Sequence, residues 1–318
     1  MWQRISRRIR EGKEKREEAA LLKKGIEQVS GRFDAAIRSV KGYRNRLQDP
    51  VRKAWRYVEK AVDAFPPPVA LDPGRWDRDP LLGSLFVDPD HLEALLRDSL
   101  ALRDYLHKHP DGTAAALLTA TRKERTIFCT LIEGNICSRD APRRAVEFRE
   151  HRIEMPTASE TELRDALKRR LLTAVATRTR ESVQDLLAWK QELVEERELL
   201  TAQLREAAIR RRAPDAESTA PPTGRIEEGH AVIEEIDRKL GEISGEIGTP
   251  ELLLNRLEAS LDRPENVLGF ELLDMRLNWM GVMLKPDSRE TGKRIVLPEI
   301  TFEDGERRVA VLVGIDKG

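Results

Sequence analysis

The stretch that decides the fold is RRVAVLVGID, residues 307–316. Its middle, VAVLVGI, is apolar at consecutive positions, so both faces of an extended chain would be apolar there. Side chains alternate between the two faces of a strand, and a run of this kind is typical of a strand covered on both faces. We therefore expect a central strand near the end of the chain.

Short runs with strand-like patterns occur in two separated segments, residues 113–155 and 266–316. The second segment also contains MRLNWMGVML and RIVLPEITF, and Asp304-Gly305 is a hairpin signal before the final run. The first segment holds four runs separated by turn residues, ALLTA, TIFCTLIE, NICSRD and RAVEFREHRIEM. A change of apolar parity in the fourth run predicts a β-bulge near Arg149-Glu150. We expect one mixed or antiparallel β body built from both segments.

The region between these segments has the periodicity of helices. A capping box from Thr157 to Glu160 begins a helix that continues to about Arg212, and residues 213–224 form a low-complexity loop. Steps of three and four recur before the loop from Val183 to Ala207, where the residues are apolar except at Lys190 and Arg197, and after it from Ile226 to Ile247. This pattern predicts an antiparallel coiled-coil hairpin inserted into the body. Leu200 and Leu204 should lie near Ile226 and Ile233.

The N-terminal region carries another heptad stripe. Its alternating steps of four and three are unbroken from Leu22 to Leu47, which predicts a continuous apolar seam on a helix. Asp49-Pro50 is the expected start of a second helix, which FPPP at 65–68 ends. The candidate partner seam consists of Leu22, Ile26, Val29, Phe33, Val40, Tyr43 and Leu47.

Residues 66–112 form a proline-rich segment followed by a helix. In GRWDRDPLLGSLF, residues 74–86, we expect Trp76 and Phe86 to be buried against the body. Asp77 and Asp79 are two apart in an extended chain, so they are expected to cap turns and pair with arginine rather than form a catalytic carboxylate pair. A helix should begin at Asp88-Pro89 or Asp90, and HPDG at 109–112 ends it.

Together these patterns predict a helix-dominated α+β fold: a mixed or antiparallel β body, an inserted long antiparallel coiled-coil hairpin and a helical N-terminal region. The expected organisation is a basic helical or coiled-coil region (1–65), a docking segment with a helix (66–112), a first β segment (113–158), a helical hairpin arm (159–248) and a helix with a completing β segment (249–318).

The only two cysteines, Cys129 and Cys137, flank Gly134-Asn135, which is a two-residue hairpin loop. That loop sets Ile132 opposite Cys137 and Cys129 opposite Asp140. The cysteines are then not cross-strand partners, and we expect neither a disulfide nor a zinc site. Two cysteines in 318 residues are no disulfide framework, which favours a cytoplasmic protein.

Other motifs with chemical potential are weak. His107 and His109, with Asp111, have the residue types of half a metal site, but they also lie in the last turn of a helix, where histidine favours the carbonyl ends. Thr291-Gly292-Lys293 lacks the upstream glycine of a phosphate-binding loop, and no HExxH, GxSxG or GxGxxG motif is present. We expect no cofactor, no metal and no catalytic residue that a motif identifies.

Charge is unevenly spread along the neutral chain. Residues 1–65 carry 18 Lys and Arg against 9 Asp and Glu, whereas residues 213–318 carry 13 against 22. In MWQRISRRIR, arginines surround a narrow apolar face without the apolar core of a secretion signal, and no run approaches about 18 apolar residues, so we expect no membrane span. The candidate anion contacts are Arg4, Arg7, Arg8 and Arg10.

These observations favour a non-catalytic cytoplasmic interaction or scaffold protein that binds a protein partner, or itself, through coiled-coil surfaces. One alternative is binding to nucleic acid or an anionic membrane surface through the basic N-terminal helix. A second alternative is an enzyme of unrecognised type with a site in the α+β body, where ionisable residues from several segments would have to converge.

Overall fold

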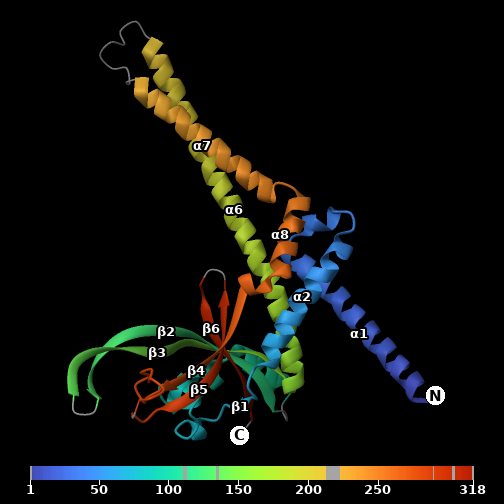
Figure 1. Cartoon of the computed structure of the whole chain (residues 1–318), viewed down its shortest axis with the longest axis vertical. Helices are drawn as coiled ribbons and strands as arrows, with labels where there is room; N and C mark the ends of the chain where they lie inside the picture. Colours follow the sequence, from blue (N-terminus) through green and yellow to red (C-terminus); the bar gives the residue numbers. More distant parts are fainter. Residues whose placement is uncertain are drawn as a thin grey trace. The chain divides into compact units, whose positions relative to one another are not determined.

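A computed structural model of the chain shows a helix-dominated α+β protein, as the sequence predicts (Figure 1). The structure describes the backbone of residues 2–109, 113–133, 136–212, 223–288, 290–302 and 305–316, and the side chains of 18–109, 113–128, 141–209, 226–288, 290–302 and 305–316. The chain divides into two compact units. The β unit comprises Trp55–Leu172 and Pro264–Gly318, and the helical unit comprises Met1–Ala54 and Thr173–Arg263.

The β unit is built on a six-stranded mixed sheet. Its strands are β1 (Val69–Ala70), β2 (Ala114–Glu133), β3 (Ile136–Thr157), β4 (Leu268–Leu277), β5 (Lys293–Phe302) and β6 (Arg307–Ile315). The order is β3-β2-β6-β5-β4, with all of these pairs antiparallel and β1 added parallel to β6. Strand β6 lies in the middle and is buried at every position from Val309 to Val313, which confirms the expected central strand.

The strands β2 and β3 form one long hairpin, where the sequence suggested four short runs. The polar stretch TRKER, residues 121–125, is part of β2 and not a turn. Three register shifts each place two residues of β3 against one of β2. At one of them Glu150 has a φ of 55°, so the bulge predicted near Arg149-Glu150 is confirmed. Beyond Thr121, β2 pairs only with β3, and we call residues 121–128 and 141–152 the ribbon.

The run MRLNWMGVML is a strand only as far as Leu277, because the chain turns at residues 278–283. Gly281 has a φ of 74°, and its carbonyl accepts a hydrogen bond from the Val146 amide at 2.8 Å. A Cβ atom at Gly281 would lie 2.6 Å from the Val146 oxygen, so only glycine fits this approach. Bridges Ala145↔Val282 and Leu277↔Met283 then connect the edge of β3 to the end of β4.

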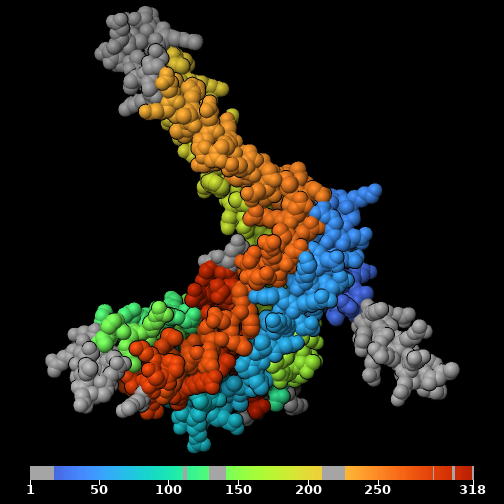
Figure 2. All heavy atoms as spheres, in the orientation of Figure 1, coloured from blue at the N-terminus to red at the C-terminus, as the bar shows by residue number. Residues whose placement is uncertain are grey.

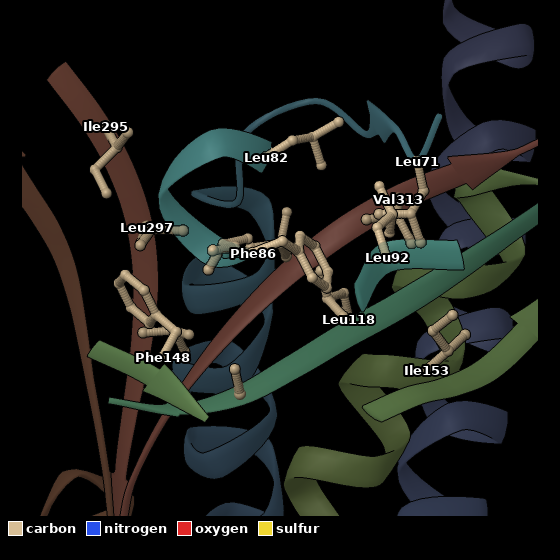
Figure 3. Close-up of a cluster of buried hydrophobic side chains, with 14 of the residues drawn as sticks. Leu71, Leu82, Phe86, Leu92, Leu118, Phe148, Ile153, Ile295, Leu297 and Val313 are labelled. Atoms are coloured by element: carbon tan, nitrogen blue, oxygen red, sulfur yellow. The ribbon is translucent and has the colours of Figure 1, made fainter. Parts of the chain in front are cut away.

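One face of the sheet is covered by the segment between β1 and β2 (Figure 3). This segment contains η2 (Pro73–Arg75), α3 (Leu82–Leu85), α4 (Pro89–Asp98) and α5 (Leu100–Lys108). Phe86 is buried as predicted, whereas Trp76 is half-buried and donates from Nε1 to the Phe86 carbonyl at 3.0 Å. The single helix expected after residue 88 is two helices, because Ser99 ends α4 and caps α5. The side chain of Asp88 caps α4, which is one of the two predicted starts.

The helical unit corrects the expectation of an unbroken helical seam from Leu22 to Leu47. Its N-terminal part consists of α1 (Trp2–Phe33), η1 (Ala35–Ser39) and α2 (Tyr43–Asp63), the last of which continues into the β unit. The helix α1 ends before Asp34, whose side chain accepts a hydrogen bond from the Ala36 amide at 2.7 Å. Gly42, with a φ of 78°, forms the turn before α2. Pro50 lies inside α2 rather than at its start.

The remaining helices are α6 (Glu160–Arg212), α7 (Thr223–Ile247) and α8 (Pro250–Asp262), with η4 (Pro264–Asn266) before β4. In the helical unit α6 and α7 lie side by side and antiparallel (Figure 1). Leu204 packs against Gly229, and Arg197 Nε lies 2.6 Å from Asp237 Oδ1. Contact near Leu204 therefore agrees with the predicted pairing, while residues 213–222 lie outside the described backbone.

Candidate functional site

A groove of about 410 Å³ lies between α1 and the first turns of α2, within the helical unit. It forms where the two helices, brought back together by the break at residues 34–42, leave their facing sides incompletely filled. It is lined by Glu18, Ala19, Leu22, Lys23, Ile26, Glu27, Arg44, Asn45, Gln48 and Arg52.

The apolar part of the groove comes from the predicted seam. Ile26 is buried, Leu22 is half-buried, and the adjacent Leu21 is 49% exposed. The next seam residues along the chain, Val29 and Phe33, are fully buried, so the stripe loses its cover towards the N-terminal end of the described side chains. An apolar surface that is partly open in this way favours contact with another apolar surface.

The rim of the groove carries charges of both signs. Arg44 Nε donates to Glu27 Oε1 at 2.9 Å, and Arg52 Nε lies 3.5 Å from Glu18 Oε1. The Glu27 carboxylate is the main cause that raises the pKa of Arg44 above its usual value. Arg44 and Arg52 are paired within the chain, so the groove presents an apolar floor with a rim of both signs rather than a pocket of strained ionisable groups.

The seam residues fall into three groups in the structure. Leu22 and Ile26 line the groove. Val29, Phe33 and Leu47 are buried within the chain. Val40 and Tyr43 are half-buried on either side of the turn that separates η1 from α2. The part of the seam that another molecule can reach is therefore shorter than the sequence suggested.

Some of the other predicted residues have side chains outside the part of the chain that the structure describes. The side chains of Arg4, Arg7, Arg8 and Arg10, and those of both cysteines, lie outside the described residues. The backbone register places Ile132 opposite Cys137, as predicted, but Cys129 opposite Ala141 instead of Asp140. A register shift between Cys129 and Leu131 causes this difference, and the cysteines are not cross-strand partners.

His109 and Asp79 have structural partners. His109 stacks on Tyr105 with ring centroids 4.4 Å apart, and its Nδ1 lies 3.0 Å from the Tyr105 carbonyl oxygen. Asp79 accepts hydrogen bonds from the amides of Leu81 and Leu82, so it caps a turn as expected. Asp111 lies outside the described residues. Within the described part of the chain, no group of three or more His, Cys, Asp or Glu residues is arranged to hold a metal ion.

The β unit contains a histidine cluster that no sequence pattern predicts. His151 stacks on Phe86 with centroids 4.7 Å apart and meets the edge of His91 at 5.0 Å. Neither ring nitrogen of His151 has a hydrogen-bond partner of good geometry. Burial lowers the pKa of His151 to about 4, and the charge of His91 acts in the same direction.

A buried ion pair was also not predicted. Arg122 of β2 donates to Glu299 of β5 through Nε at 2.6 Å and Nη2 at 3.0 Å, and it also contacts Glu124. The hydrogen bond that Arg122 donates to Glu299 is the main cause that raises the pKa of Arg122. One signal existed in the sequence: Glu299 has the same parity as Ile295 and Leu297, which face the core.

No protein-family model matches this chain, and no curated protein or solved structure is similar to it. Among the described residues, no helix is both long enough and apolar enough to cross a bilayer. The geometry of the chain itself is therefore the basis for a functional proposal.

Proposed function

We propose that this protein is a cytoplasmic interaction protein that associates with a second copy of itself through the groove between α1 and α2. The observation that carries the proposal is an apolar floor with a half-buried Leu22, next to an exposed Leu21 on the same helix. Helices recognise one another by placing apolar side chains of this kind into such grooves.

The charges on the rim favour a second copy as the occupant. In a two-fold symmetric contact the same surface meets itself, so a rim of one sign would be repelled. The rim here combines Lys23, Arg44 and Arg52 with Glu18 and Glu27, so an antiparallel copy of α1 can bring opposite charges together. Leu21 and Leu22 of each copy then supply the apolar contact for the other.

The test is the molar mass of the full chain by size-exclusion chromatography with light scattering. We expect a dimer whose mass falls to that of a monomer in Leu22→Glu, because a charge in an apolar contact must be desolvated without a counter-ion. Leu22 is only half-buried, so circular dichroism should show that the variant keeps its helices.

Leu199→Glu is the matched control, because Leu199 is an exposed leucine on α6 of the same unit. It should leave the dimer intact. A wild-type chain that remains monomeric as its concentration is raised would overturn the proposal, and so would a Leu22→Glu variant that stays dimeric. A dimer that dissociates at moderate salt would instead favour an electrostatic contact, such as one through Arg4, Arg7, Arg8 and Arg10.

A further inference from the structure

The ribbon is a basic surface on a neutral chain. Its twenty residues, 121–128 and 141–152, include seven Lys and Arg and three Glu. Two of the arginines are already paired with carboxylates outside the ribbon, Arg122 with Glu299 and Arg143 with Glu290. The remaining excess of positive charge is exposed along the two strands.

Three of these cations share one face of the ribbon. Lys123 pairs across the strands with Glu147, Arg125 with Ala145 and Thr121 with Arg149. Because side chains alternate between faces, Lys123, Arg125 and Arg149 point to the same side, and we call them the ribbon cation cluster. All three are exposed, and part of the ribbon's surface, green in Figure 2, is open on the face in view.

Two described carboxylates lie near this face: Glu147, and Glu150, whose Oε2 accepts a hydrogen bond from Thr121 Oγ1 at 3.0 Å. Arg149 Nε lies 2.8 Å from Glu147 Oε1. The pKa of Glu147 is lowered first by its hydrogen bond with Arg149 and then by the charges of Arg149, Arg125 and Lys123. Neither Lys123 nor Arg125 makes a direct ion pair with another side chain that the structure describes. The cluster therefore has uncompensated positive charge.

An exposed tryptophan lies on the turn that adjoins the ribbon. Trp279 is 90% exposed, although its backbone belongs to a turn held in place by Asn278, whose Oδ1 accepts from the amides of Met280 and Val282. The Val146 amide, one residue from Glu147, donates to Gly281 on this turn. The neighbouring Met280 is 45% exposed, so the two side chains form an exposed apolar patch beside the ribbon, and such patches are typical of binding surfaces.

We propose that the ribbon cation cluster and Trp279 bind single-stranded nucleic acid. The cations contact the phosphates, and the indole stacks on an unpaired base. A single strand fits better than a duplex because the bases of a duplex are already stacked on one another and offer no free face to Trp279. An acidic protein segment would use the cations but gain less from the indole.

The experiment measures the fluorescence anisotropy of a labelled oligothymidine of about 20 nucleotides with the full chain, as a function of salt. The variant Lys123→Gln/Arg125→Gln/Arg149→Gln should reduce the slope of log affinity against log salt by about two, since each phosphate contact on a single strand contributes about 0.7. Trp279→Ala should weaken binding about tenfold while leaving the slope unchanged.

Two further variants locate the site. Arg205→Gln/Arg238→Gln/Lys239→Gln removes three positive charges from the helical unit and should bind like the wild type. If Arg4→Gln/Arg7→Gln/Arg8→Gln/Arg10→Gln abolishes binding while the ribbon variant binds normally, the proposal is wrong and the N-terminal helix is the site. Preference for a duplex, full competition by polyglutamate with no effect of Trp279→Ala, or no binding at low salt would also overturn it.

Discussion

Two arginines, one in each unit, hold carboxylates from distant parts of the chain, and their surroundings differ. In the β unit, the side chain of Arg122 is 7% exposed and that of its partner Glu299 is 4% exposed. In the helical unit, Arg46 of α2 binds Glu258 of α8 through Nε at 2.7 Å, and it also contacts Glu251 and Asn255. Arg46 is 32% exposed, and Glu251 is 55% exposed.

The difference in exposure means that the loss of one partner affects stability differently in the two arginine–carboxylate contacts. Removing one partner of a buried pair leaves the other charge desolvated and unpaired. A solvent-exposed arginine that loses its partner is hydrated by water instead. In the β unit, loss of either partner of the Arg122–Glu299 pair therefore leaves a charge buried. In the helical unit, the contacts of Arg46 with Glu251 and Glu258 are more exposed, so loss of one partner costs less.

The largest effect should come from Glu299→Gln. The change leaves the Arg122 guanidinium buried with only Glu124 beside it, so unfolding free energy should fall by about 3 kcal/mol. Chemical denaturation followed by circular dichroism measures this loss. The matched double variant Arg122→Met/Glu299→Leu should recover most of it, because a well-packed apolar pair replaces a buried ion pair with little cost. Equal losses in both variants would contradict this account.

Sequence patterns predicted the elements whose side chains are buried in a regular period. The consecutive apolar residues of β6 identified a central strand, and the stripes from Val183 and from Ile226 identified α6 and α7. The full length of β2 was not predicted. Residues 122–125 extend beyond β6, and all four are polar, so they carry no alternation of apolar and polar residues.

The break in the predicted seam shows a different limit. The steps from Leu22 to Leu47 are regular, yet the cap at Asp34 and the positive φ at Gly42 divide the stripe between helices. The local backbone conformation therefore determined where the helices end. The periodicity continues across the break because both helices pack against the same interior. As a result, Leu22 and Ile26 of the predicted seam line a groove that the sequence did not predict, and their contact with a partner stays a prediction.

Contacts between distant segments that no periodic pattern specifies could not be predicted. His91 and His151 are on α4 and β3, and Arg122 and Glu299 are 177 residues apart. The bulge at Glu150 sets the parity of His151, and no periodic pattern specifies which helix then covers it. The ribbon cation cluster depends in the same way on a pairing register that the turn residues alone did not establish.

A smaller effect should follow from acidification of the β unit. The pKa of His151 is about 4 in the folded chain against 6.5 for an ordinary histidine, so the unfolded state binds the proton more readily between these values. Stability should therefore be unaffected above pH 6.5 and should fall as the pH drops towards 4, by about 2 kcal/mol after allowance for the partly solvated ring. His151→Phe keeps the stack on Phe86 and should remove this part of the pH dependence. An unchanged pH profile in that variant would contradict the assignment.

The smallest effect is expected for Arg46→Met in the helical unit, and it is the sharpest test of the contrast between the units. The contacts with Glu258 and Asn255 connect α2 to α8, but water can reach the arginine and its partners, so the unfolding free energy should fall by about 1 kcal/mol. Salt of about 0.5 M should reduce the difference between variant and wild type, since exposed charges are screened over a few ångströms at that strength. The Arg122–Glu299 pair should be far less sensitive to salt, because its side chains are only 7% and 4% exposed. If Arg46→Met lowers the unfolding free energy as much as Glu299→Gln does, the exposed contacts of Arg46 stabilise the chain as much as the buried pair. Burial would then not explain the difference expected between the two contacts.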